Sequence, residues 1–166
     1  MKLTQLLLDQ LDREAVRTRR ALENVPRGKD DWTPHAKSMP LLRLAGLVAA
    51  MPSWIALIIN QDQLEIGPPA GQSQQPTADA LVSTLDKSVK DGRAALEGTT
   101  DDYLLTTNWK LLFQGNVVMD QPRHVVLVDT FNHLAHHRAQ LTVYLRLNDV
   151  PVPSMYGPSA DDQRFG

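Results

Sequence analysis

Four stretches of the sequence carry apolar residues at helical spacing, and loops rich in proline and glycine separate them. The first covers about residues 2–24, the second begins near Ser38, the third follows Thr77 as far as Gly98, and the fourth covers about residues 122–147. Amphipathic helices joined by loops of ordinary length bury their apolar faces against one another. The pattern therefore predicts an all-α fold, a four-helix bundle.

The second helix has an internal proline. Ser38 is a candidate N-cap for this helix, and Pro52 lies in its middle. A proline there removes one backbone hydrogen bond, so we expect a kink near residues 48–52. The apolar pattern resumes after Pro52, which indicates one kinked helix and not two.

The pattern changes before the fourth helix, over residues 103–119. Two short apolar runs flank Gln114-Gly115-Asn116, which predicts a short hairpin or an irregular segment. Residues 67–76 read as a surface loop, and residues 148–166 as an extended C-terminal tail.

Composition narrows the classes of function. The 166 residues suit one domain, 1–166, and the 42% hydrophobic content supports a core. The absence of cysteine excludes disulfides, thiolate metal ligands and a cysteine nucleophile. A net charge of −2 argues against a nucleic-acid partner. No apolar stretch approaches the roughly 20 residues of a membrane span, so we expect no membrane association and a cytoplasmic location.

Three of the five histidines lie together on the fourth helix. His133 and His137 are four residues apart and therefore share one face, where two imidazoles can bind one divalent metal ion. They border the expected core stripe, which should place them half inside the bundle, whereas His136 points partly away. Asp129, one turn earlier, is a further ligand, a residue that orients His133, or a solvated charge.

A further carboxylate is available on the first helix. Glu14 is a weaker candidate ligand, and a salt bridge is its commoner role.

Several segments, taken in order, resemble the DinB-like (DinB/YfiT) family, whose members are predicted metalloenzymes. The fourth-helix segment reads Asn-His-Leu-Ala-His-His-Arg-Ala-Gln-Leu from residue 132. The segments that carry the resemblance are residues 18–26, 32–39, 44–54, 132–146 and 156–161.

The resemblance implies a four-helix bundle, often a homodimer, with a metal held by one histidine of the second helix and two of the fourth. The matching fourth-helix ligands are His133 and His137. At the matching second-helix position this chain has Leu47, which cannot bind a metal. We therefore expect a divalent metal, Zn²⁺ or Ni²⁺, to be held weakly and at partial occupancy.

One face of the second helix carries Leu47, Met51 and Trp54. In the family arrangement this face looks toward the histidines, so the three residues form either ordinary core or, with His136 and Asp129, an apolar pocket for a small molecule. Trp109 and Phe113 would then cover one end of the pocket. The residues predicted for the site are therefore Leu47, Met51, Trp54, Trp109, Phe113, Asp129, His133, His136 and His137.

Two functions stay open. Known family activities include thiol-dependent S-transferases, which implies a metal-dependent small-molecule transferase or hydrolase. The alternative is a protein that keeps the fold without a metal and acts in ligand binding or as a dimeric interaction module. Both predict a small-molecule ligand or a second copy of the chain as the partner.

Overall fold

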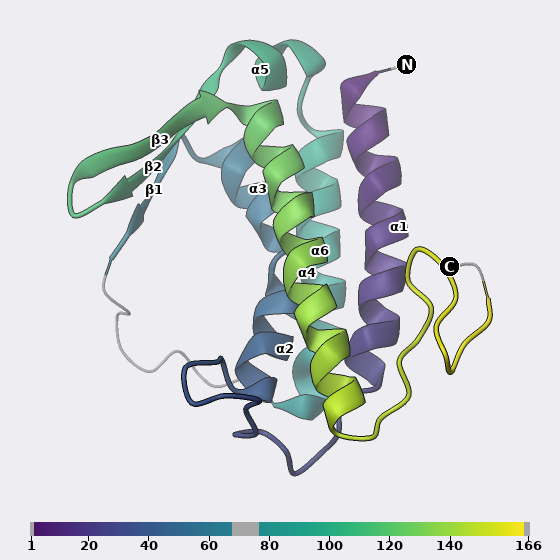
Figure 1. Cartoon of the computed structure of the whole chain (residues 1–166). Helices are drawn as coiled ribbons and strands as arrows, with labels where there is room; N and C mark the ends of the chain where they lie inside the picture. The colour runs from purple at the N-terminus through teal and green to yellow at the C-terminus, as the bar shows by residue number, and fades with distance from the viewer. Residues whose placement is uncertain (1, 68–76, 165–166) are drawn as a thin grey trace.

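The four predicted helical stretches lie side by side in the computed structural model, which describes residues 2–67 and 77–164 (Figure 1). Residues 68–76 of the predicted surface loop lie outside the described residues. The long helices are α1 (Leu3–Glu23), α2 (Leu41–Ala50), α3 (Ser53–Asn60), α4 (Leu81–Glu97) and α6 (Arg123–Leu147).

The second stretch forms two helices instead of one kinked helix. Helices α2 and α3 meet at 49° across Met51 and Pro52, so the expected kink is a full break. The prediction of Ser38 as N-cap is wrong, because α2 begins after Pro40 with no side-chain cap. Carbonyls of the preceding loop, those of Trp32 and Asp30, accept from the first two free N–H groups of the helix instead.

A three-stranded sheet corrects the all-α prediction. Strands β2 (Asn108–Phe113) and β3 (Asn116–Pro122) form the antiparallel hairpin that was one of the two predictions for this segment. Gln114 and Gly115 form its turn with φ values of 50° and 75°, a left-handed pair that matches the twist of hairpin strands. Strand β1 (Gln63–Ile66) pairs in parallel with β2, in the order β1-β2-β3.

Two short helices complete the part of the chain that the structure describes. A 3₁₀ turn, η1 (Ala78–Ala80), precedes α4, and α5 (Asp101–Thr106) links α4 to the hairpin. The Asp101 carboxylate accepts hydrogen bonds of 2.9 Å from the backbone N–H groups of Leu3 and Thr4. A residue distant in sequence therefore caps the start of α1.

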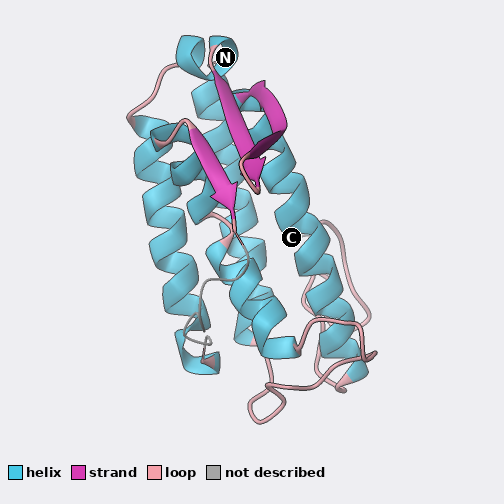
Figure 2. Cartoon of the chain, turned by 90° about the vertical axis from the view of Figure 1, so that its left-hand side faces the viewer, coloured by secondary structure: helices cyan, strands magenta, loops and turns pink. Residues whose placement is uncertain are grey.

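The core consists of two adjoining clusters, one around α2 and one around α3, and Trp54 and Val89 contact both. The stripe predicted on α6 is confirmed, because each of its members is buried: Val126, Thr130, Leu134, Leu141 and Leu145. The sheet lies across the helices on one side of the molecule (Figure 2). That placement creates the space in which the candidate site lies.

A buried ion pair joins α1 to α6. Arg138 donates to the Glu14 carboxylate at 2.5 Å, and each residue is 1% exposed. Tyr156, in the extended tail, also donates to that carboxylate, at 3.0 Å. The salt-bridge role considered for Glu14 is confirmed, and the tail is anchored against the two helices.

Among the described residues, no single helix has the length and apolar character needed to cross a membrane. By those two measures alone, the bent pair of α2 and α3 would qualify.

Candidate functional site

An apolar cavity of about 470 Å³ lies between the sheet and helices α3 and α6. It brings together four residues singled out from the sequence, Trp54, Trp109, Asp129 and His133. We refer to it as the apolar cavity; its described lining consists of Trp54, Leu57, Ile58, Leu64, Ile66, Trp109, Leu111, Met119, Val126, Asp129, Thr130 and His133.

The alternation of side chains along the strands builds one wall. Trp109 and Leu111 of β2 line the cavity, whereas Lys110 between them is exposed and lies 4.0 Å from Asp120. Leu64 of β1 is in register with Leu111 and lines the same wall. The alternation of side chains along β2 can be predicted from the sequence. The parallel pairing that brings β1 beside β2 cannot.

The expectation that Trp109 and Phe113 cover one end of the pocket is half right. Trp109 is buried in the cavity wall, where its indole N–H has no hydrogen-bond partner among the described residues. Phe113, at the end of β2, is 45% exposed and does not line the cavity.

His133 and His137 form a hydrogen-bonded pair. Their Nε2 atoms are 2.9 Å apart, and His137 Nδ1 is 2.8 Å from the side-chain oxygen of Gln140. Since that oxygen can only accept, His137 carries its proton on Nδ1 and offers a lone pair at Nε2. His133 therefore donates from Nε2, and its Nδ1 keeps a free lone pair.

The surroundings of His133 favour its neutral form. Partial desolvation lowers the pKa of His133 below its ordinary value of 6.5, and the neighbouring His137 and His136 lower it further. The ring of His133 lies 5.4 Å from the Trp54 ring and 4.6 Å from that of His137. At neutral pH His133 is therefore an uncharged hydrogen-bonding group beside an aromatic wall.

One of the two imidazoles lies further out than expected. His133 is exposed, whereas His137 is half-buried, which is the position expected for both. The position of His133 follows from the rotation of α6 about its axis. This rotation buries Arg138 against Glu14 and thereby turns His133 toward the cavity beside the sheet.

The remaining predicted site residues are dispersed. Met51 is fully buried in the core cluster around α2, and Leu47 is partly buried against the same cluster. His136 is exposed, with its ring 5.0 Å from that of His137. Asp129 is exposed at the cavity, and the described hydrogen-bond partner of His133 is His137, not Asp129.

The histidine pair does not fit a tight metal centre by itself. Within residues 2–67 and 77–164, no three histidine, cysteine or acidic side chains are grouped as a metal site would need. Catalytic zinc sites use three protein ligands, and two nitrogens on one tetrahedral zinc lie about 3.3 Å apart. The 2.9 Å separation of the two Nε2 atoms is that of a hydrogen bond.

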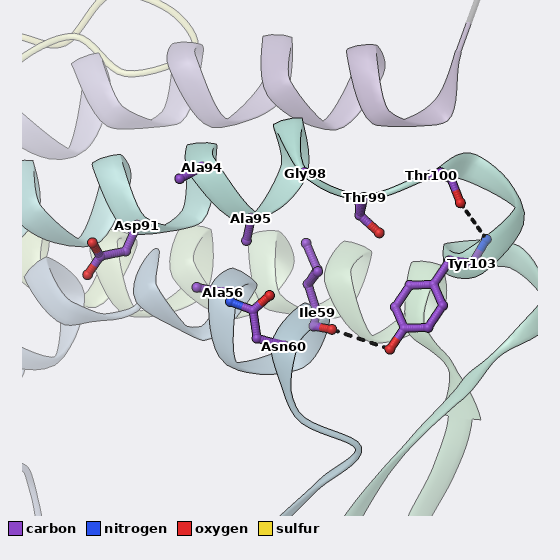
Figure 3. A pocket seen from close by; sticks show the side chains of 10 residues that line it. All are labelled: Ala56, Ile59, Asn60, Asp91, Ala94, Ala95, Gly98, Thr99, Thr100 and Tyr103. Atoms are coloured by element: carbon purple, nitrogen blue, oxygen red, sulfur yellow. Dashed lines mark hydrogen bonds between the residues drawn. The ribbon is translucent and has the colours of Figure 1, made fainter.

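A second, larger space lies on another side of the molecule, between α3, α4 and α5 (Figure 3). This groove has a volume of about 720 Å³, and small or polar side chains such as Ala95, Gly98 and Thr99 line much of it. Tyr103 closes one end, where its hydroxyl donates to the Ile59 carbonyl at 3.4 Å. None of the histidines lines this groove, so it lacks the imidazole group that the apolar cavity has for binding or proton transfer.

Comparison with known proteins supports the resemblance seen in the sequence. A family model described as the DinB family matches residues 1–164. A DinB-like protein of Bacillus cereus ATCC 10987 has a similar structure, with a TM-score of 0.69 at 22% identity over 90% of this chain and 95% of that one. The DinB-like protein YjoA of Bacillus subtilis gives a TM-score of 0.66 at 17% identity, over 88% and 96% of the two chains.

At these identities the two structures establish a shared fold. No curated protein matches the sequence.

Proposed function

Since this chain belongs to the DinB family, we propose that it binds an apolar small molecule in the apolar cavity, with the His133–His137 pair at its polar end. The observation that carries the proposal is the composition of the cavity. Aliphatic and aromatic side chains form most of its wall, and the polar residues Asp129, Thr130 and His133 are grouped on α6.

The size and polarity of the cavity support this function. Small-molecule sites are commonly 300–1,000 Å³ in volume, mainly apolar, with a few polar groups that orient the ligand. A volume of about 470 Å³ falls in that range. Burial of an alkyl chain stabilises a complex by about 0.8 kcal/mol per CH₂ before the costs of association.

Calorimetric titration with 1-octanol tests the proposal. We expect saturable binding to the unmodified protein and a loss of affinity of at least about tenfold in Leu57→Trp, which fills the cavity from α3. Leu6→Trp is the matched control, because Leu6 lies on α1, is 42% exposed and does not line the cavity. Absence of binding, or equal effects of the two substitutions, contradicts the proposal.

A metal-dependent small-molecule transferase or hydrolase is the second candidate. The proximity of the two Nε2 atoms favours it, because the tautomer of His133 with its proton on Nδ1 would leave a lone pair on both Nε2 atoms. A divalent metal there would lower the pKa of a bound water or thiol. With Leu47 at the second-helix position, the donor set supports only weak binding of Zn²⁺ or Ni²⁺.

The homodimer expected from the family resemblance is also a proposal. Sedimentation equilibrium tests it directly, since one chain has a mass of 18.5 kDa and a dimer has twice that mass. A mass of one chain at micromolar concentration would contradict it.

A further inference from the structure

We infer that the ligand of the apolar cavity carries a cationic, hydrogen-bond-donating head, of the primary ammonium type, which lies at Asp129 and His133 while its apolar body enters the cavity. This inference rests on the proposed function and adds the chemical class of the ligand. The acceptor groups at the polar end of the cavity carry it.

Asp129 supplies the charge. It is the only charged side chain among the described residues that line the cavity, and the described part of the chain gives it no salt bridge. A carboxylate only accepts hydrogen bonds, so it attracts a donor and repels an anion. Its position on α6, one turn before His133, places both residues at the same end of the cavity.

His133 supplies a second acceptor. Its Nε2 proton is used in the bond to His137, which leaves the Nδ1 lone pair as the free hydrogen-bonding position. A ligand that only accepts hydrogen bonds would find no donor on this ring, whereas an ammonium group would find an acceptor.

Trp54 adds a third favourable feature. Its ring lies 5.4 Å from that of His133 and lines the same cavity. The face of an indole attracts cations, by about 0.5–1 kcal/mol where the site is exposed. Carboxylate, imidazole lone pair and indole all favour the same kind of head group.

Three ligands with one alkyl chain test the inference: n-octylammonium, 1-octanol and octanoate. Their affinities are to be measured at pH 7.5 and low ionic strength by calorimetry and by tryptophan fluorescence, to which Trp54 and Trp109 of the cavity wall contribute together with Trp32. Octylammonium should bind about threefold to fivefold more tightly than 1-octanol, and octanoate more weakly than either, as for an exposed ion pair. High salt should reduce the preference.

Asp129→Asn is the decisive variant, because it keeps the shape of the side chain and removes its charge. It should abolish the preference for octylammonium over 1-octanol. Asp31→Asn is the matched control, since it changes the net charge equally from an exposed loop that does not line the cavity.

The outcomes separate this inference from the proposed function. Binding of 1-octanol with no preference for octylammonium, or a preference for octanoate, overturns the inference and leaves the proposed function standing. A preference that persists in Asp129→Asn overturns the role of the carboxylate. Failure of all three ligands to bind overturns both. The salt dependence of the unmodified protein provides a measurement that needs no variant.

Discussion

A Cβ atom on Gly92 would lie 2.8 Å from the carbonyl oxygen of Pro52. Gly92 is a buried residue of α4, and Pro52 lies at the break between α2 and α3. The same added atom would lie 3.4 Å from the Cβ of Ile55. The break between α2 and α3 therefore fits against the point where α4 has no side chain. Helix α4 passes close to the break because residue 92 is glycine.

Gly92→Ala should destabilise the protein. Alanine favours a helix over glycine by about 1 kcal/mol, but a Cβ this close to a backbone oxygen forces α4 away from the break. Overpacking of this kind costs about 1–3 kcal/mol, so we expect a net loss of up to about 2 kcal/mol in the free energy of unfolding. Urea denaturation measures it, with exposed Lys90→Ala on the same helix as the control. A gain in stability would show that the helices separate at no cost.

Arg138→Met should be the more damaging substitution. It leaves the buried Glu14 carboxylate with Arg17, 2.8 Å away, as its remaining cation, and breaking one side of a buried pair costs up to about 3–5 kcal/mol. Lys87→Met, which removes the exposed pair with Asp91, should change stability by no more than about 0.5 kcal/mol. Similar losses in the two variants would mean that water reaches Glu14 in the folded protein.

Leu47→His tests the metal hypothesis. The natural protein, purified without a histidine tag or chelating column, should contain less than one Zn²⁺ or Ni²⁺ per chain, because two imidazoles are its best donors. Elemental analysis should find a marked increase in the variant. Tight, full occupancy in the natural protein that Leu47→His leaves unchanged would contradict this view of Leu47.

The histidines themselves give a comparison within the same experiment. His133→Ala should lower metal content more than His136→Ala, because His133 shares its Nε2 contact with His137. Equal effects would mean that the pair is not the metal-binding position.

His133 should titrate below pH 6.5, because burial and the neighbouring His137 and His136 disfavour its charged form. A pKa lowered on folding means that the unfolded chain binds the proton first. The contribution of His133 to stability is therefore complete above pH 6.5 and falls as the pH drops through that value toward its folded pKa. Proton NMR of the imidazole measures the pKa directly.

His137→Gln should raise the pKa of His133 toward 6.5, because the interaction with His137 is one of the causes that lower it. Asp31→Asn, in a distant loop, should leave it unchanged. An unchanged pKa in His137→Gln would show that desolvation alone is responsible, because burial is its largest cause.

Local patterns predicted what local interactions decide. Helix α1 and the buried stripe of α6 follow from apolar spacing, and the hairpin follows from two apolar runs that flank a turn with Gly115, a residue that tolerates positive φ. The position of the break at Pro52 also follows from the missing N–H of proline.

The cap of α2 was missed for a different reason. Backbone carbonyls of the loop, not the Ser38 side chain, accept from its first N–H groups. A backbone carbonyl is present at every residue and leaves no mark in the sequence.

Contacts between distant segments decided the rest. The four residues of β1 do not stand out from the neighbouring sequence as a strand. They form one because β2, more than forty residues later in the chain, offers them an edge to pair with. The candidate site depends on that pairing, since β1 and β2 together form one wall of the apolar cavity.

The sequence by itself determined the family, the helices and the pairing of His133 with His137, because four-residue spacing on a helix brings two side chains together wherever the helix packs. Only the tertiary structure decided that His133 lines an apolar cavity between the sheet and helices α3 and α6. The rotation of α6 is set by its burial of Arg138 against Glu14, and the cavity by a sheet whose strands come from separate parts of the chain.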